Sequence, residues 1–456
     1  MSSNNGVTYF ARGLVGYQET DIGIAQSDRR YHFLAIGRTG TGKSTLLLSK
    51  IIQDMRAGRG LALIDPHGDL AEAALSFVPR ERQKHLVYIN PTDLDYPVGL
   101  NLLEKAETTE SHLVAANVVS IFKNLWSDSW GPRLEYVLNN TLLALLEHPA
   151  SNLLWVSKLL NDENFRKRIV NKVKDPVVRD YWEREFTGYS DRFRAEVISP
   201  IQNKIGAYLT NRPLRNILGQ SKSTIHFSNL INQGHILIAN LSKGSLGEDA
   251  ANLLGSLLVS RIQQAALARA NIPEAERRDF YLYIDEYHNF TTQGFASILA
   301  EARKYRLNLI LAHQYLDQID QKIRAAVIAN TGTIVIFRVG PEDAQVLAKE
   351  FGPDWPWSNL VNLNHYEIYY KLISNGKVSE PRQAVTLPSP KLREDVEAYK
   401  QKLIEASRRR YSRPRELVER KINNFFGLPK PLLAIAANFE KSKKTPVTTF
   451  SISGKS

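Results

Sequence analysis

Residues 37–44 read Gly-Arg-Thr-Gly-Thr-Gly-Lys-Ser and match the phosphate-binding loop pattern G-x-x-x-x-G-K-[ST] at every fixed position. The glycines let the backbone curl so that successive N–H groups point at phosphate oxygens. A chance turn rich in Gly and Thr is the alternative, but it does not explain the apolar run at 33–36 or the helix-forming run at 45–55. The sequence therefore predicts a nucleoside triphosphate site.

Within this loop, Lys43 is expected to reach the β- and γ-phosphates and to assist catalysis, and the Ser44 hydroxyl to bind Mg²⁺. The predicted cofactors are ATP and Mg²⁺. The residues predicted to bind nucleotide in and after the loop are Gly37, Arg38, Thr39, Gly40, Thr41, Gly42, Lys43, Ser44 and Thr45.

Two adjacent acids, Asp285 and Glu286, follow the apolar run 281–284. Asp285 is expected to hold Mg²⁺ through water or Ser44, and Glu286 to polarise the attacking water. Strands ending in a surface Asp-Glu pair are common, but the presence of the phosphate-binding loop favours the catalytic interpretation. Glu286 is the residue that distinguishes hydrolysis from binding alone.

Polar residues beside two other apolar runs are further candidates. Gln314 follows the run 307–311 and is a candidate sensor of the γ-phosphate; the alternative is a strand-end side chain bonded to backbone. Arg303 precedes that run and cannot easily turn back to its own loop, so it is predicted to be an arginine finger donated to a neighbouring subunit. A solvated basic cluster is its alternative. Arg338, after the run 333–337, is a weaker candidate for phosphate contact.

Asp65 follows the apolar run 61–64, at a strand end where open parallel sheets bind their ligands. It is therefore a candidate nucleotide-site residue, with a helix-capping turn that uses Asp69 as the cap as the alternative. His67 and His313 lack the partner spacing of a metal site, and neither is predicted to be a ligand.

Alternating strand and helix patterns position these residues. Such alternation predicts an α/β fold with a mainly parallel sheet. Strand signals disappear from about 104 to 222, where apolar residues recur at helical spacing. The predicted strands are residues 31–36, 61–64, 85–89, 235–239, 280–284, 307–311 and 333–337. The predicted organisation is an N-terminal segment 1–30, a nucleotide-binding domain in two parts, 31–103 and 226–388, an all-α insertion 104–225 and a basic helical C-terminal extension 389–456.

Composition narrows the class of protein. The chain has 456 residues, 43% hydrophobic, and no cysteine, which excludes disulfides and thiolate zinc sites. No apolar run approaches the roughly 18–20 residues of a membrane helix. The net charge is +12, of which residues 389–456 carry +9 (16 basic, 7 acidic), leaving +3 for the first 388 residues. The extension is interpreted either as a partner-binding or nucleic-acid arm or as a solvated extension, with charged helix over 392–410 and partial order at best beyond about 439.

Tryptophans interleaved with arginines in the insertion have two interpretations. In one interpretation these side chains stack on single-stranded bases, and in the other the tryptophans fill the core of a helical domain. The helical spacing of the tryptophans favours the core. The residues are Trp126, Trp130, Trp155 and Trp182 with Arg133, Arg166, Lys167, Arg168, Arg192 and Arg194.

Taken together, these motifs resemble the ATPase domain of conjugative coupling proteins of type IV secretion systems, within the superfamily of FtsK- and HerA-like DNA pumps. The resemblance covers about 30–390. It is carried by residues 37–44, 63–69, 130–133, 284–290, 301–306, 313–314 and 337–340.

The resemblance implies a RecA-like P-loop NTPase fold, an all-helical domain at one end of a homo-hexameric ring, and ATP-driven passage of DNA through a central channel. It also implies that Arg303 acts in trans and that Gln314 lies at the sensor position. Membrane-anchored coupling proteins carry transmembrane helices before this domain, whereas only about 30 polar-to-mixed residues precede it here. The expectation is a cytoplasmic member without a direct membrane span, peripheral at a membrane channel, with a relaxase or channel component as partner.

Other classes of protein remain as alternatives. A ring ATPase that moves protein, or that powers assembly of a secretion apparatus, would use the same chemistry, and the nearly neutral body mildly favours it. A GTP switch is disfavoured because residues 171–174 and 203–206 both lack the aspartate of the N-K-x-D pattern. A small-molecule kinase fits less well, since Glu286 beside Asp285 suits water activation better than phosphotransfer.

Overall fold

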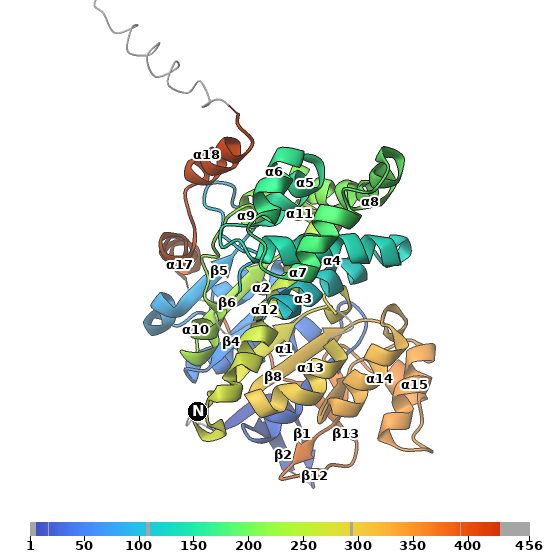
Figure 1. The fold of residues 1–456 in the computed structure, drawn as a ribbon. Helices are drawn as coiled ribbons and strands as arrows, with labels where there is room; N and C mark the ends of the chain where they lie inside the picture. Colours follow the sequence, from blue (N-terminus) through green and yellow to red (C-terminus); the bar gives the residue numbers. More distant parts are fainter. Residues whose placement is uncertain (1–5, 17, 106–109, 292–294, 393, 429–456) are drawn as a thin grey trace, which may run out of the picture.

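An eleven-stranded sheet forms the centre of the molecule, in the strand order β2-β1-β13-β10-β9-β3-β8-β7-β4-β6-β5. The computed structural model describes residues 6–16, 18–105, 110–291, 295–392 and 394–428. Helices cover the sheet, and a group of helices rises beyond one end of it (Figure 1). The predicted α/β class with a mainly parallel sheet is confirmed.

Seven neighbouring strands of this sheet are parallel. Every residue in them is buried, as expected for strands that are covered by helices on both faces. Each one lies within two residues of a predicted strand. They are β3 (Phe33–Ile36), β4 (Gly60–Asp65), β5 (Leu86–Ile89), β6 (Ile236–Asn240), β7 (Phe280–Ile284), β8 (Leu307–His313) and β9 (Thr333–Ile336).

Four antiparallel strands extend the sheet on the β9 side, and the sequence patterns did not predict them. β1 (Val7–Val15) and β2 (Gln18–Ala25) come from the N-terminal segment, and β10 (Glu367–Lys371) and β13 (Arg382–Thr386) from the end of the second nucleotide-binding part. Their burial alternates or is low, so they lack the continuous apolar runs that identified the parallel strands. A small separate hairpin joins β11 (Ile373–Ser374) to β12 (Lys377–Val378).

Between β5 and β6, every regular element within the described residues is helical. The larger ones form the group that stands away from the sheet in Figure 1. Trp126 and Trp182 are 4% and 1% exposed, and Trp130 and Trp155 pack against the same core, which supports the core interpretation of the tryptophans. The α-helices are α3 (Ser111–Leu125), α4 (Pro132–Leu146), α5 (Leu153–Asn161), α6 (Glu163–Val170), α7 (Pro176–Asp180), α8 (Asp191–Thr210), α9 (Arg212–Leu218) and α10 (Phe227–Asn232).

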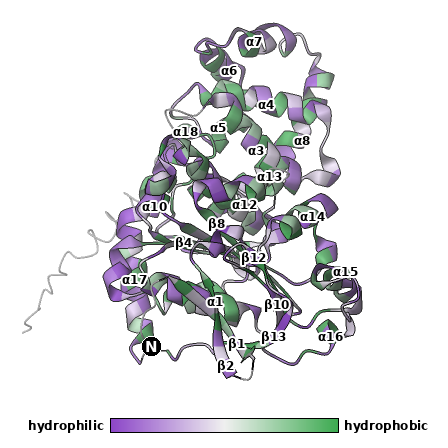
Figure 2. Cartoon of the chain, turned by 90° about the horizontal axis from the view of Figure 1, so that it is seen from below, coloured by the Kyte–Doolittle hydropathy of each residue, from purple (hydrophilic) through white to green (hydrophobic). Residues whose placement is uncertain are grey.

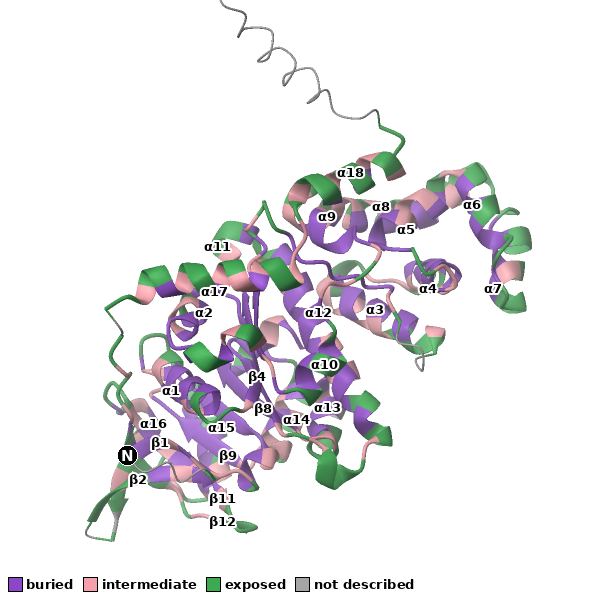
Figure 3. Ribbon diagram, turned by 90° about the vertical axis from the view of Figure 1, so that its left-hand side faces the viewer, coloured by how far each residue is buried: buried purple, intermediate pink, exposed green. Residues whose placement is uncertain are grey.

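The remaining helices pack on the sheet or connect its strands, as Figure 3 shows by the buried residues on their inner faces. Helix α1 begins at the end of the phosphate-binding loop and packs against β1 and β4 of the sheet. Apart from the two C-terminal helices described below, the α-helices around the sheet are α1 (Lys43–Arg56), α2 (Asp69–Leu75), α11 (Lys243–Leu246), α12 (Glu248–Leu267), α13 (Phe295–Glu301), α14 (Gln321–Asn330), α15 (Pro341–Phe351) and α16 (Ser358–Val361).

The C-terminal extension is docked on the body through two helices, α17 (Val396–Tyr411) and α18 (Arg415–Phe425). The outer face of α17 is largely hydrophilic (Figure 2), yet Leu403 on its inner face is fully buried. Val418 of α18 is 2% exposed and packs in a small core with α5. Arg408 pairs with Asp93 at 2.6 Å. Over 396–425 the extension is therefore folded against the body, which the sequence patterns did not predict, and its binding of a partner or of nucleic acid stays a prediction; the expectation for the chain beyond 439 falls outside the described residues.

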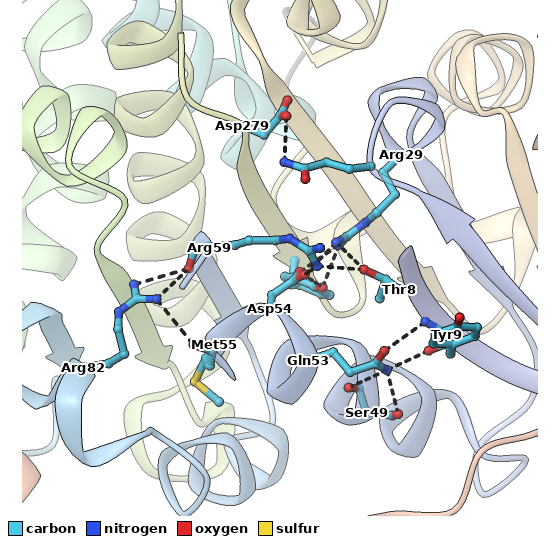
Figure 4. Close-up of polar contacts among 12 residues, drawn as sticks. Thr8, Tyr9, Arg29, Ser49, Gln53, Asp54, Met55, Arg59, Arg82 and Asp279 are labelled. Carbon is cyan, nitrogen blue, oxygen red and sulfur yellow. Dashed lines mark hydrogen bonds and ion pairs between the residues drawn. The ribbon is translucent and has the colours of Figure 1, made fainter. Parts of the chain in front are cut away.

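A buried ionic network fastens the N-terminal segment to α1 (Figure 4). Arg29 donates two hydrogen bonds to the Asp54 carboxylate, at 2.6 and 2.7 Å, and one to the Thr8 hydroxyl at 2.8 Å. Arg59 and the Tyr283 hydroxyl also donate to Asp54, at 3.0 and 2.5 Å. Because every lone pair that the carboxylate offers is used, its complete burial is compensated. Helix α1 is thus held at its C-terminal end while its N-terminal end carries the loop.

Replacement of Asp54 by Asn is expected to lower the free energy of unfolding by about 3–5 kcal/mol, because two buried guanidinium groups lose their counter-charge. Burial tends to raise the pKa of Asp54, but Arg29 and its other donors outweigh it and lower the pKa. The contribution of the ionised Asp54 carboxylate to the free energy of unfolding is therefore present at neutral pH, and it is lost as the pH falls below the ordinary pKa range of aspartate. Urea unfolding followed by circular dichroism measures the change.

The matched control is Asp21→Asn, which removes the partner of Arg12 from a surface pair whose side chains are 49% and 34% exposed. Such a pair is worth at most about 1 kcal/mol. Equal destabilisation by the two variants would contradict the role given to the buried network.

Candidate nucleotide-binding site

The phosphate-binding loop connects β3 to α1 and has the backbone that its glycines allow. Gly40 and Gly42 have φ values of +78° and +118°, in the region that side chains disfavour. The loop is anchored to neighbouring strands, since the Gly37 N–H donates to the His313 carbonyl at 3.2 Å and the Arg38 N–H to the Arg338 carbonyl at 2.9 Å. The N-terminus of the 14-residue helix α1 then points its free N–H groups into the loop.

Lys43 lies inside this loop and is 6% exposed. Its ammonium group donates to the carbonyl oxygens of Gly37 and Arg38, at 2.5 and 3.2 Å. Burial lowers the pKa of Lys43, against the opposing effect of the nearby carboxylates of Glu286 and Asp285. The ammonium is therefore held between the loop and the acids, where a cation would meet a bound phosphate chain.

Asp285 and Glu286 follow β7 and are buried, at 6% and 4% exposure. Burial, and then the charges of Glu286 and Asp65, raise the pKa of Asp285 to about 7. A carboxylate among other carboxylates fits a divalent cation, because a cation would relieve their repulsion, and oxygen donors are those that Mg²⁺ prefers. Asp285 and the exposed Ser44 hydroxyl are the residues present that would hold Mg²⁺.

Glu286 has an unusual backbone, with φ +47° and ψ +55°. A left-handed conformation at a residue other than Gly costs energy and is characteristic of functional sites. Two bonds support it, one from the Glu286 N–H to the Asp285 carboxylate at 3.1 Å and one from the Asn289 side chain to the Glu286 carbonyl at 2.9 Å. The carboxylate is thereby aimed at the neighbouring strand β8.

At the end of β8, His313 approaches Glu286, with 3.4 Å between Nδ1 and Oε2. Burial tends to raise the pKa of Glu286, but interactions with His313, Lys43 and Gln314 outweigh it and lower the pKa. Gln314 also accepts a hydrogen bond from the Thr39 hydroxyl at 2.8 Å. The predicted sensor therefore lies between the loop and the predicted general base.

His288 also lies beside Glu286, and sequence reasoning did not identify it. Its Nδ1 is 3.6 Å from Glu286 Oε2 and 3.2 Å from His313 Nδ1. Burial, and then the proximity of His313, lower the pKa of His288 to about 4. His313 therefore has neighbours with possible ligand atoms that spacing along the sequence did not reveal, because they come from the neighbouring strand end rather than from nearby sequence.

Asp65 and Arg338 lie close to the loop in different ways. Both carboxylate oxygens of Asp65 accept backbone N–H groups, from His67 at 2.9 Å and Ala71 at 2.8 Å. Asp65 therefore stabilises the start of α2, a role that the capping alternative gave to Asp69. The charge of Asp65 also raises the pKa of Asp285. Arg338 meets the loop through its carbonyl, which accepts from Arg38.

Two residues of the antiparallel part also touch the loop, and the sequence patterns did not indicate them. The Tyr366 N–H donates to the Thr41 carbonyl at 3.0 Å, and a His365 ring nitrogen lies 2.9 Å from the Gly40 carbonyl oxygen. A Cβ on Gly42 would come within 2.8 Å of the Tyr366 ring. The loop is thus fixed from both sides, which explains the need for glycine at 42.

Arg303 lies at the opposite edge of the sheet. It precedes β8, whereas the loop contacts His313 and Gln314 at the other end of that strand, and seven residues of strand span about 20 Å. Its guanidinium group stacks on the Tyr31 ring at 3.9 Å, and within the described residues it has no ion-pair partner. The structure does not bring Arg303 to the loop of its own chain.

Comparison with known proteins agrees with this architecture. A family model described as the type IV secretion-system coupling protein DNA-binding domain matches residues 17–354. The type 4 coupling protein DotL of Legionella pneumophila subsp. pneumophila (strain Philadelphia 1) is 22% identical, in an alignment that covers 93% of this chain. The chain spans 63% of the length of that relative.

Solved structures share the fold. The plasmid coupling protein TrwB in complex with ADP and Mg²⁺ superposes with a TM-score of 0.61 at 16% identity, over 85% of this chain and 96% of the other. VirB4 of Thermoanaerobacter pseudethanolicus gives 0.52 at 13% identity, over 79% and 89%. Within the described residues, no helix is long and apolar enough to cross a membrane. With a RecA-like P-loop NTPase fold and a family match over most of its length, the chain belongs to the type IV secretion-system coupling protein family.

Proposed function

We propose that the protein is an ATP-hydrolysing, hexameric DNA translocase whose catalytic site is shared between neighbouring subunits. The phosphate-binding loop, Lys43 and Ser44 would bind ATP and Mg²⁺ with Asp285, and Glu286 would take the proton of the attacking water. Gln314 would respond to the γ-phosphate. Family membership supports the coupling to secretion and the binding of DNA.

One observation, the position of Arg303, supports a catalytic site that is shared between neighbouring subunits. Arg303 lies at the edge of the sheet opposite the loop, exposed and held on Tyr31, so a single chain cannot bring it to its own nucleotide. In a ring with head-to-tail contacts, the edge of one subunit faces the site of the next. Such an arrangement would supply the positive charge that phosphoryl transfer needs.

The proposal extends to the surroundings of the ring. We propose that the ring lies at the cytoplasmic entrance of a secretion channel, with a relaxase or a channel component as its partner. The helical group between β5 and β6 would form one end of the ring. The nearly neutral charge of the body supports a second candidate function, a ring that moves protein. The ATPase assay with DNA described below distinguishes the two functions.

ATP turnover is expected to rise when DNA is added, and Lys43→Ala to abolish it. DNA affinity should fall steeply with salt, by a slope in log–log form of about −0.9 per phosphate contact for duplex and about −0.7 for single strands. A steady-state ATPase assay with single- or double-stranded DNA measures the stimulation of turnover. Repeating the DNA titration at several salt concentrations gives the salt dependence of the DNA affinity.

A turnover rate that neither single- nor double-stranded DNA changes would contradict DNA translocation. Cross-linking to a labelled polypeptide but not to DNA under ATP would then favour the protein-moving ring.

A further inference from the structure

Three side chains beside the nucleotide site each place one possible ligand atom close to those of the other two. They are Glu286, His288 in the turn after β7, and His313 at the end of β8, and their ligand atoms all lie within 4.8 Å of one another. The three distances are 3.2 Å between the two Nδ1 atoms, 3.4 Å from His313 Nδ1 to Glu286 Oε2, and 3.6 Å from His288 Nδ1 to Glu286 Oε2. The triangle is nearly equilateral.

This triangle has the size that a tetrahedral metal ion requires. Bonds of about 2.0–2.1 Å from Zn²⁺ to imidazole nitrogen and carboxylate oxygen place two ligand atoms about 3.3 Å apart. The three measured distances lie on either side of that value. Two histidines with one glutamate form a known ligand set for a zinc ion that keeps an open fourth position.

The protonation pattern of His313 suits a ligand. Its Nε2 contacts the Tyr315 carbonyl oxygen, and a carbonyl only accepts, so Nε2 carries a proton; in the neutral imidazole that binds metals, Nδ1 is then the nitrogen free to act as the ligand. Ligating histidines characteristically donate their second ring N–H to such an acceptor. The His313 side chain is fully buried and its ring is fixed.

Access and selectivity follow from burial and donor type. The Glu286 side chain is 5% exposed and that of His288 is 20% exposed, so His288 forms the open side of the cluster. Imidazole nitrogens suit ions such as Zn²⁺, whereas Mg²⁺ prefers oxygen donors. The cluster therefore differs in ligand type from the magnesium site assigned to Ser44 and Asp285.

We propose that Glu286, His288 and His313 bind a divalent transition-metal ion of the Zn²⁺ class, and that the bound ion switches off ATP hydrolysis by occupying the Glu286 carboxylate. A carboxylate oxygen that coordinates a metal no longer accepts the proton of the attacking water. The metal site stands on the geometry alone, whereas the switch rests on the proposed function.

The test uses the full chain without a histidine tag, titrated with Co²⁺ as a spectroscopic substitute for Zn²⁺. The wild type is expected to give the visible absorption of tetrahedral Co²⁺, at one ion per chain, and to lose it when Zn²⁺ is added. His288→Ala removes the ligand that is partly exposed and is the least disruptive change. It should weaken binding by at least the roughly 10–100-fold that loss of a second-shell partner costs.

His112→Ala is the matched control, since His112 is exposed on α3 and far from the cluster in sequence and fold. It should bind Co²⁺ as the wild type does. Equal Co²⁺ binding by the wild type and His288→Ala, or only octahedral spectra, would overturn the site.

The switch has a separate readout. Zn²⁺ at a buffered free concentration, with Mg²⁺ in large excess, should inhibit ATP turnover of the wild type and inhibit His288→Ala far less, each relative to its own metal-free rate. Tetrahedral Co²⁺ binding without Zn²⁺ inhibition would overturn the switch and retain the site. If no ATP turnover were found under any condition, the proposed function would fail, and the Co²⁺ spectrum would still decide the site.

Discussion

Arg303→Ala is expected to lower ATP turnover by about 10³–10⁵-fold, the contribution that an arginine finger makes to phosphoryl transfer. Nucleotide binding should be retained, because the loop and Lys43 of the same chain lie at the other edge of the sheet from Arg303. The measurement is steady-state ATP hydrolysis beside equilibrium binding of a fluorescent ATP analogue. Arg303→Lys should recover little activity, since a single ammonium does not reproduce the planar fork of the guanidinium group.

Lys304→Ala provides the control for this variant. Lys304 is the adjacent exposed cation, and it contributes only its carbonyl to the contact with Arg277. Its removal changes the local charge equally and should leave turnover near the wild-type rate. An Arg303→Ala protein that assembled and hydrolysed ATP normally would contradict the site shared between subunits.

Glu286→Gln is expected to lower the hydrolysis rate by about 10²–10⁴-fold, which is the usual contribution of general acid–base catalysis. The amide has nearly the same shape and cannot take the proton of water. Binding of Mg²⁺ and ATP should persist, since Lys43, Ser44 and Asp285 are unchanged. Single-turnover hydrolysis, measured after ATP has bound, separates the chemical step from binding.

Glu163→Gln is the matched control, because Glu163 is an exposed acid on α6, in the helical group away from the loop. It should hydrolyse ATP as the wild type does. Wild-type single-turnover rates in Glu286→Gln would assign the general base to another residue.

The parallel half of the fold could be predicted because its strands are continuous apolar runs between helices. The strand Phe280–Ile284 is identical to the predicted range, and β3 and β4 differ from theirs by at most two residues. Several of the runs are followed by polar residues, among them Asp65 and Asp285, and parallel strands end at one edge of a sheet. The approach of Asp285 and Gln314 to the loop followed from that rule.

The antiparallel half could not be predicted in the same way. The strand Glu367–Lys371 alternates between half-buried and buried residues, and Gln18–Ala25 is mostly exposed over its first half. Because its strands were not recognised, the contact of Tyr366 with the loop was missed.

The histidine cluster was missed for a different reason. His288 and His313 are 25 residues apart and meet only because β7 and β8 are neighbours in the sheet. Spacing along the chain reveals ligands that share one helix or one turn, whereas the ends of adjacent parallel strands bring together residues at arbitrary separations. Sheet order was therefore the information that the sequence lacked.

The docking of the C-terminal extension was not predicted because its charge was considered without its periodicity. Tyr399 and Leu403 are spaced four residues apart and form the buried face of α17, and Val418 with Ile422 repeats that spacing in α18. Several of the basic side chains on the outer faces pair with acids of the body, among them Arg408 with Asp93. An amphipathic helix can carry a large net charge and still be docked.

Electron cryomicroscopy of the protein with a non-hydrolysable ATP analogue, with and without DNA, tests the shared catalytic site most directly. The predicted result is a six-fold ring in which the Arg303 guanidinium of each subunit lies at hydrogen-bond distance from the γ-phosphate on the loop of its neighbour, with DNA in the central channel. A monomer under all conditions, or a ring in which Arg303 lies away from every nucleotide, would contradict it.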